Sequence, residues 1–165
     1  MGNCCNKNGK TYLLQQQVVG VPTATAVTLA FELEHYFCGG RKICVNDAYP
    51  VQASLNFTVG TPVSVGNNAY SVPIIITGNV TYMPFVNNNG CGCGCQPVCP
   101  ITEGLWCVAS MYVTSATGVP TVTIAAPTSV IATPANVQTC CTVTNACDIE
   151  TAVNVTITPP ATAAA

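Results

Sequence analysis

The stretch Val27-Thr28-Leu29-Ala30-Phe31-Glu32-Leu33-Glu34 decides the fold class. Large apolar side chains occupy every second position, and small or polar side chains, including both glutamates, occupy the positions between them. A period of two is typical of a β-strand that buries one face and leaves the other in water. We therefore expect a half-buried strand over this stretch.

Similar segments recur along the chain and are separated by turn signals rich in Gly, Pro and Asn. They are expected at 11–19, 51–59, 69–86 (one or two strands), 105–113, 119–125, 129–132, 137–143 and 151–158. No long segment shows a helical period, and Thr and Val are abundant, as is usual in strands. About eight short strands with this spacing predict an all-β fold, either a β-sandwich or a jelly roll.

The length of 165 residues suits a single domain. Residues 1–10 are polar and predict a flexible N-terminal arm, while residues 161–165 form a small tail. The single all-β domain is expected over 11–160, interrupted by a Cys- and Gly-rich loop at 87–100.

Charged residues are scarce in this chain. Only 6% of the residues are charged and the net charge is -2, whereas about 25% is usual. A weakly charged surface near neutrality favours association, so the sequence predicts a protein whose main partner is itself. The alternatives are a heavily glycosylated secreted domain and a domain stabilised mainly by Thr hydroxyls and Asn amides. Four basic residues are too few for a nucleic-acid surface, and no apolar run is long enough to span a bilayer as a helix.

Twelve cysteines in 165 residues indicate an oxidising environment or a metal site. The first ten residues are polar where a secretory signal would be apolar. We therefore expect a protein that is made without an export signal and is oxidised afterwards.

Adjacent cysteines suggest how such a protein would be cross-linked. Neighbouring cysteines rarely bond to each other, and in an extended segment their side chains point to opposite sides. Cys4 and Cys5 on a flexible arm can therefore reach two different partners, unless they are unpaired thiols on a frayed end. The candidates for disulfides between copies are Cys4, Cys5, Cys91, Cys93, Cys95, Cys99, Cys140 and Cys141; those for disulfides within a copy are Cys38, Cys44, Cys107 and Cys147. The connectivity stays open.

Two other chemistries are conceivable for these cysteines. The run from Cys91 to Cys99 supplies four thiols, but zinc sites favour a Cys-x₂₋₄-Cys spacing and the loop has no His. A Cys–His dyad would have to use His35, the one histidine, together with a third orienting group. We expect no metal, no cofactor and no catalytic residues.

The cysteine-rich, sparsely charged all-β pattern resembles the self-assembling proteins of bacterial spore surfaces. These include the clostridial exosporium proteins, which form two-dimensional lattices, and the endospore appendage subunits, which are jelly rolls with a Cys-bearing N-terminal connector. The resemblance implies that Cys4 and Cys5 are the connector cysteines, although the appendage connector has a further Cys soon after the pair and this chain has none before Cys38. It also implies a spore-surface location, in the exosporium or outer coat, and spore-coat proteins as further candidate partners.

Overall fold

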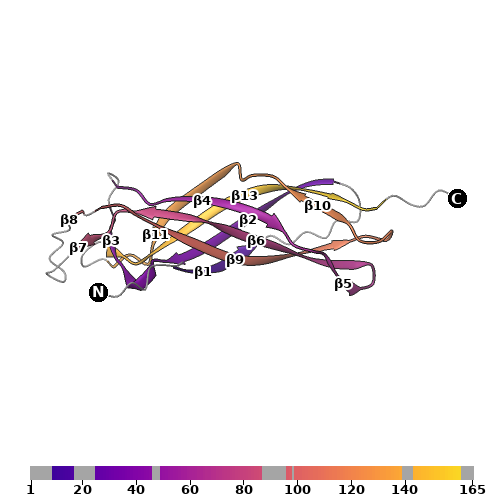
Figure 1. The fold of residues 1–165 in the computed structure, drawn as a ribbon, viewed down its shortest axis with the longest axis horizontal. Helices are drawn as coiled ribbons and strands as arrows, with labels where there is room; N and C mark the ends of the chain where they lie inside the picture. The colour runs from indigo at the N-terminus through magenta and orange to yellow at the C-terminus, as the bar shows by residue number, and fades with distance from the viewer. Residues whose placement is uncertain are drawn as a thin grey trace.

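The computed structural model describes residues 9–16, 25–45, 49–86, 96–97, 99–138 and 143–160. These residues form an all-β sandwich, which confirms the predicted fold class. Figure 1 shows two curled sheets that run along the long axis of an elongated molecule. A single 3-10 turn, η2 (Cys38–Gly40), is the one helical element in the described part of the chain. No helix in that part is long and apolar enough to cross a membrane.

All strand pairs between the described residues are antiparallel. Sheet 1 contains β1 (Lys10–Gln16), β2 (Thr25–Tyr36), β13 (Ala146–Thr158), β10 (Thr121–Ile124) and β11 (Ser129–Ala135). Sheet 2 contains β4 (Gln52–Val59), β6 (Ala69–Tyr82), β5 (Val63–Gly66) and β9 (Ile101–Thr114). Two short pairs complete the fold: β3 (Ile43–Cys44) with β12 (Val143–Thr144), and β7 (Phe85–Val86) with β8 (Gln96–Pro97). In addition, β1 lies beside β9, while β10 and β11 lie beside β4, so both long sides of the sandwich are closed.

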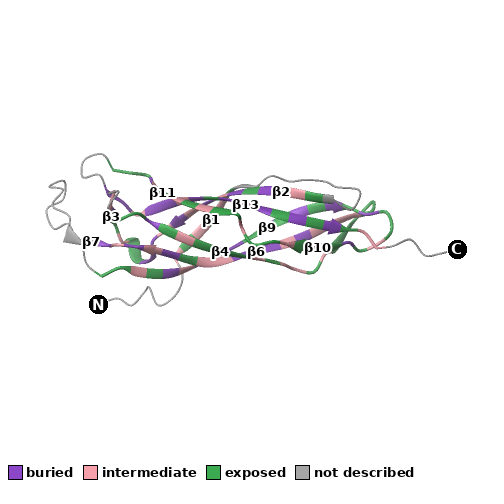
Figure 2. Ribbon diagram, turned by 90° about the horizontal axis from the view of Figure 1, so that it is seen from above, coloured by how far each residue is buried: buried purple, intermediate pink, exposed green. Residues whose placement is uncertain are grey.

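The core lies between the two sheets and follows from the alternation in the sequence. Leu29, Phe31 and Leu33 of β2 are buried, and the residues between them point outward, as the bands of colour in Figure 2 show. Across the core, the ring of Phe31 contacts the ring of Phe57 in β4, with centroids 5.4 Å apart. Burying such apolar side chains is the main force that holds the two sheets together.

The long strands differ from the short ones that the sequence suggested. The predicted segment 69–86 holds two strands, β6 and β7, and the predicted strand at 105–113 belongs to β9; β6 and β9 have 14 residues each. Pro73 lies inside β6 and does not interrupt it. At this point the neighbour of β6 changes from β4 to β5, and the Pro73 carbonyl accepts a hydrogen bond from Gly60. Because no ladder bond is needed from its nitrogen there, the proline does not end the strand.

The boundaries of the domain in the structure also differ from those that the sequence predicted. β1 already begins at Lys10, so the expected arm ends one residue earlier, at Gly9. A side chain at Gly9 would collide with the carbonyl of Tyr36, so the chain passes too close to β2 for any larger residue. The segment 137–143 forms a bridge between Gln138 and Val143 rather than a continuous strand among its described residues. Residues 1–8 and 161–165 lie outside the described residues.

Candidate functional site

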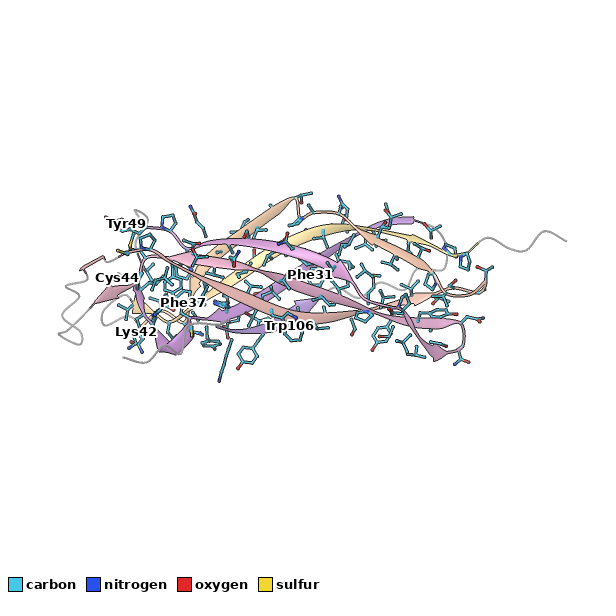
Figure 3. All side chains as sticks on the ribbon, in the orientation of Figure 1. Phe31, Phe37, Lys42, Cys44, Tyr49 and Trp106 are labelled. Carbon is cyan, nitrogen blue, oxygen red and sulfur yellow. The ribbon has the colours of Figure 1, made fainter. Side chains whose placement is uncertain are left out.

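The cysteines that the structure describes are unevenly distributed along the long axis of the molecule. The short strands β3, β7 and β8 lie at one end, and β5 and β10 lie towards the other (Figure 1). Figure 3 places Cys44 and Lys42 at the first of these ends, which we call the cysteine-bearing end; it comprises η2, β3, β7, β8 and β12. In contrast, the sequence has no cysteine in 45–90 or 108–139, the segments that supply β5 and β10.

Most cysteines belong to the cysteine-bearing end or lie close to it in the sequence. Cys38 is in η2, Cys44 is in β3 and forms a disulfide, and Cys99 is exposed shortly after β8. Seven cysteines lie outside the described residues: Cys4, Cys5, Cys91, Cys93, Cys95, Cys140 and Cys141. In the sequence they precede β1, lie between β7 and β8, or immediately precede β12. Their predicted links between copies stay predictions.

The structure places two of the expected internal disulfide residues as buried thiols. Cys107 on β9 and Cys147 on β13 are free. In the strand registers Cys107 is paired with Ile76 and Cys147 with His35, so no cysteine lies opposite either of them. Burial raises the pKa of the Cys107 thiol. Burial, helped by the nearby charges of Asp148 and Glu103, raises the pKa of Cys147 to about 12. Both thiols therefore stay protonated and poorly reactive at neutral pH.

A buried polar cluster lies inside the sandwich near the same end. His35 is 0% exposed and Glu103 is 4% exposed. His35 donates from Nε2 to Glu103 Oε1 at 2.7 Å. The backbone N–H of Cys38 donates to both carboxylate oxygens at 3.1 Å, and the Tyr82 hydroxyl donates to Oε2 at 3.0 Å. His35 Nδ1 is hydrogen-bonded to the Thr11 hydroxyl at 2.8 Å.

This cluster connects five elements, β1, β2, η2, β6 and β9, around a single carboxylate. Both ring nitrogens of His35 are already hydrogen-bonded, to Thr11 and Glu103, so the ring forms no dyad with a described cysteine. The role that these contacts support is structural, because buried polar groups of this kind hold a fold in one arrangement when every partner is satisfied.

No protein-family model, curated protein or solved structure matches this chain. Its function is therefore inferred from its own residues, above all from the distribution of cysteines and charges. Among the residues that the structure describes, no group of three or more His, Cys, Asp and Glu is arranged to hold a metal ion. The zinc alternative concerned Cys91, Cys93 and Cys95 with Cys99, and the first three lie outside the described residues.

The acidic residues gather on the outer side of sheet 1. Four of the six Asp and Glu residues in the chain, Glu32, Glu34, Asp148 and Glu150, lie there; we call this surface the acidic face. Glu32 is directly opposite Glu150, and Glu34 is directly opposite Asp148. Like charges in such cross-strand positions repel one another. The alternation placed Glu32 and Glu34 on one face, but nothing in the sequence revealed that Asp148 and Glu150 lie beside them.

Asp148 is the most constrained member of the acidic face. Its Oδ1 atom is buried and has no hydrogen-bond partner among the described residues. Burial raises the pKa of this carboxyl, and the charges of Glu34, Glu32 and Glu150 raise it further. A raised pKa in the folded state means that the fold is favoured when Asp148 is protonated and loses that stability as the pH rises through the folded pKa.

We therefore expect Asp148→Asn to stabilise the reduced monomer at pH 7, by about 0.5–1 kcal/mol, because one repulsive cross-strand pair is removed. The gain should vanish below about pH 3.9, where the unfolded aspartate is itself protonated. Urea unfolding of the wild-type protein and of the variant at several pH values measures the difference in their unfolding free energies. Asn154→Asp on the same strand is the control. It makes the reverse change between Asn and Asp at a position where the opposite residue is the uncharged Thr28, so that no like charges face each other across the strands. A variant less stable than wild type at pH 7 would contradict this account of Asp148.

Proposed function

We propose that the protein is a structural protein that self-assembles into a disulfide-cross-linked homopolymer, a two-dimensional lattice or a fibre, in a resistant outer layer of a bacterial spore. One observation carries the proposal: in a sparsely charged β-sandwich, the disulfide-bonded Cys44 and the exposed Cys99 both belong to the cysteine-bearing end, and the chain segments that supply β5 and β10 contain no cysteine. The partner is a second copy of the chain, with other spore-coat proteins as further partners. The spore surface as its location rests on the resemblance stated above.

Disulfides suit this role because they change how an assembly comes apart. Structural disulfides with low reduction potentials resist the cellular thiol pool. Copies that are joined through exposed cysteines then separate only after reduction, even when their non-covalent contacts are weakened. Cys99 is exposed at the cysteine-bearing end and is accessible to such a reaction, whereas Cys107 and Cys147 are buried within one copy.

The outer face of sheet 2 supplies apolar surface for contacts between copies. Trp106, Val108 and Tyr112 all point outward from β9, and Trp106 is 56% exposed. Ile75 of β6, opposite Val108, continues this apolar strip and is half-buried. Contiguous exposed apolar side chains mark a surface that another protein covers. With few charges to keep copies apart, this strip favours association.

A module that is stabilised by internal disulfides is the second candidate function, either a secreted binding module or a metal-binding one. The observation that favours it is Cys44, which is disulfide-bonded in the single chain. This bond shows that part of the cysteine content serves the fold itself. The two candidates differ in one respect that can be measured: only the first requires covalent links between copies.

The deciding experiment compares the oxidised protein with and without reductant. We expect light scattering after gel filtration to show assemblies many times heavier than the 17.0 kDa chain, and a denaturing gel to resolve them into single chains only after a thiol reagent is added. Electron microscopy of the same sample would distinguish a lattice from a fibre. An oxidised protein that elutes as a clean monomer would overturn the proposed function and support the internally stabilised module.

A further inference from the structure

The outer face of sheet 2 carries no charge in the part of the chain that the structure describes. The side chains that point outward from β4, β6 and β9 are apolar or are uncharged Ser, Thr, Asn and Gln. The one charged residue among the described residues of sheet 2 is Glu103, which is buried in the core. It is also the only charged residue in the sequence from 48 to 147. This face can therefore be dehydrated without stripping water from an ion.

Apolar side chains gather along the middle of this face. Val108 of β9 is directly opposite Ile75 of β6, and Trp106 occupies the next outward position along β9. Trp106 is 56% exposed, and Figure 3 places it away from both ends of the molecule. Further along the face, the exposed Val63 and Tyr112 share one row, on either side of β6. A central aromatic side chain ringed by apolar and uncharged polar neighbours is typical of the anchor of a protein–protein interface.

The face is large enough for a stable contact between two copies. β6 and β9 have 14 residues each, which corresponds to about 48 Å of strand. With β4 alongside and about 4.8 Å between neighbouring strands, the face covers roughly 700 Å². A stable interface of standard size buries about 800 Å² on each partner. One such face that covers another therefore approaches the size of a specific dimer contact.

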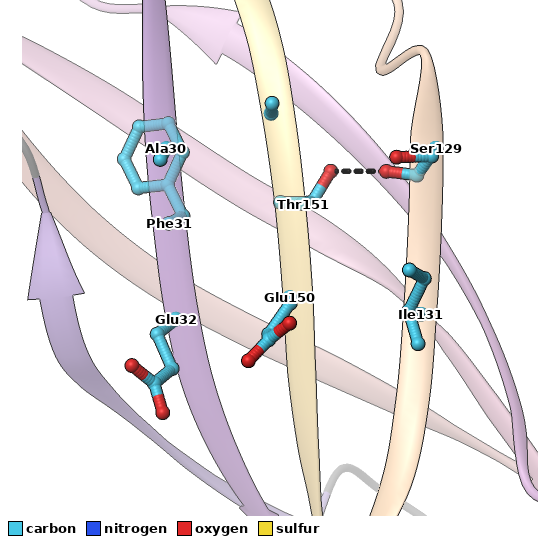
Figure 4. A pocket seen from close by; sticks show the side chains of 8 residues that line it. Ala30, Phe31, Glu32, Ser129, Ile131, Glu150 and Thr151 are labelled. Atoms are coloured by element: carbon cyan, nitrogen blue, oxygen red, sulfur yellow. Dashed lines mark hydrogen bonds between the residues drawn. The ribbon is translucent and has the colours of Figure 1, made fainter.

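The outer side of sheet 1 is a poor partner for this face. Figure 4 shows Glu32 and Glu150 on neighbouring strands of sheet 1, beside a hollow of about 560 Å³ that Ile131 also borders. A flat apolar surface laid over them would remove water from the carboxylates and leave the hollow unfilled. Dehydrating a carboxylate is costly even when a cation accompanies it, and an unfilled void loses packing contacts. The uncharged face therefore has its best complement in an identical face.

We propose that the outer face of sheet 2 is a self-complementary interface, through which a second copy of this chain packs with its own sheet 2. In such an isologous contact each copy contributes the same surface, so Trp106 is buried in both copies. The two outer faces stack as sheets do inside a β-sandwich, about 10 Å apart. The inference rests on the proposed self-assembly and adds that its unit is a pair that forms without disulfides, which cross-linking then joins to other pairs.

The first test needs no substitution, because Trp106 is the only tryptophan in the chain. The wild-type protein is diluted in the presence of a thiol reagent, and its mass by light scattering and its tryptophan emission are followed together. We expect a pair whose Kd is no weaker than about 10 μM, since interfaces of this size range from micromolar to picomolar. Pairing should shift the emission to shorter wavelengths, because the indole of Trp106 then leaves water.

Substitutions on the two faces separate this interface from general effects of surface charge. Trp106→Lys should raise the Kd at least about a hundredfold, because each copy loses a central anchor and gains a charge inside the contact. Ile131→Lys on β11 is the matched control. Ile131 is also 56% exposed and also points outward, but from sheet 1, so its replacement should leave the Kd unchanged. Circular dichroism checks that both variants are folded.

Mixing tests the symmetry of the contact. Trp106→Glu should be monomeric on its own, and an equal mixture with Trp106→Lys should recover pairs, because the opposite charges meet only if the two faces lie on each other. A mixture that stays monomeric would mean that the face docks elsewhere, and the inference would be wrong.

A reduced wild-type protein that stays a monomer, or a pair that forms without a shift in emission, would also overturn the inference. In these cases cross-linking on oxidation would leave the proposed function standing. Pairs that form under reductant but never cross-link after oxidation would have the opposite meaning, because the sheet 2 interface would stand and the proposed function would fall.

Discussion

Replacing Glu103 by glutamine should destabilise the reduced monomer by about 3–5 kcal/mol, because it removes a buried carboxylate and leaves several of its hydrogen-bond partners unsatisfied. The carboxylate accepts hydrogen bonds from His35, Cys38 and Tyr82. A glutamine keeps the shape but has one acceptor oxygen and an NH₂ group that would face a donor. The cost is a large share of the 5–15 kcal/mol that keeps a typical domain folded.

Urea unfolding followed by circular dichroism, with reductant present, measures this loss. Glu150→Gln is the matched control, since it makes the same chemical change at an exposed position of β13. The control should not destabilise the protein; it should raise the unfolding free energy by at most about 1 kcal/mol, because it removes the repulsion between Glu150 and Glu32. A loss below about 1 kcal/mol for Glu103→Gln would mean that the cluster does not hold the sheets together as its geometry indicates.

The second large effect concerns Cys4 and Cys5. We expect Cys4→Ser with Cys5→Ser to fold normally and to form assemblies that dissociate in hot detergent without reductant, whereas wild-type assemblies resist the same treatment. The fold should survive because the buried side chains of the core belong to β1 and later strands. The resistance should be lost because each link across copies makes dissociation depend on breaking a covalent bond.

The resistant fraction after heating in detergent is read from a non-reducing gel. Asn3→Ser with Asn6→Ser is the matched control, because it puts two serines into the same segment and keeps both thiols. Equal resistance of the cysteine variant and wild type would show that the arm is not the link. The cross-link would then have to come from Cys91, Cys93, Cys95 and Cys99.

The sequence predicted those parts of the fold that depend on local pattern. The alternation over 27–34 continues to His35, so the same phase that buries Leu33 also buries the histidine. Its partner Glu103 is 68 residues away and lies on the other sheet. That contact depends on how the sheets pack, and no periodicity in one strand encodes it.

The same limit applies to the acidic face and to the strand lengths. Glu32 and Glu34 could be placed on one side of a strand, but Asp148 and Glu150 join them only through the register of β2 with β13. Register between strands so distant in sequence is set by the burial of both inner faces. The length of β6 depends on the register in the same way, because whether Pro73 ends the strand depends on which neighbour needs its missing N–H.

The end of the sandwich formed by β5 and β10 contains no cysteine among the described residues, and this gives any layer built from the protein a direction. If every covalent bond forms at one end of an elongated subunit, the bonds cannot run end to end through the stack, and they tie neighbours together in a single plane. A sheet made of such subunits, aligned side by side, has a reactive, cross-linked surface and an opposite surface of turns next to β5 and β10, where the described part of the chain has no cysteine. Such a layer is anisotropic, because a reagent that attacks thiols or disulfides reaches them from one side only.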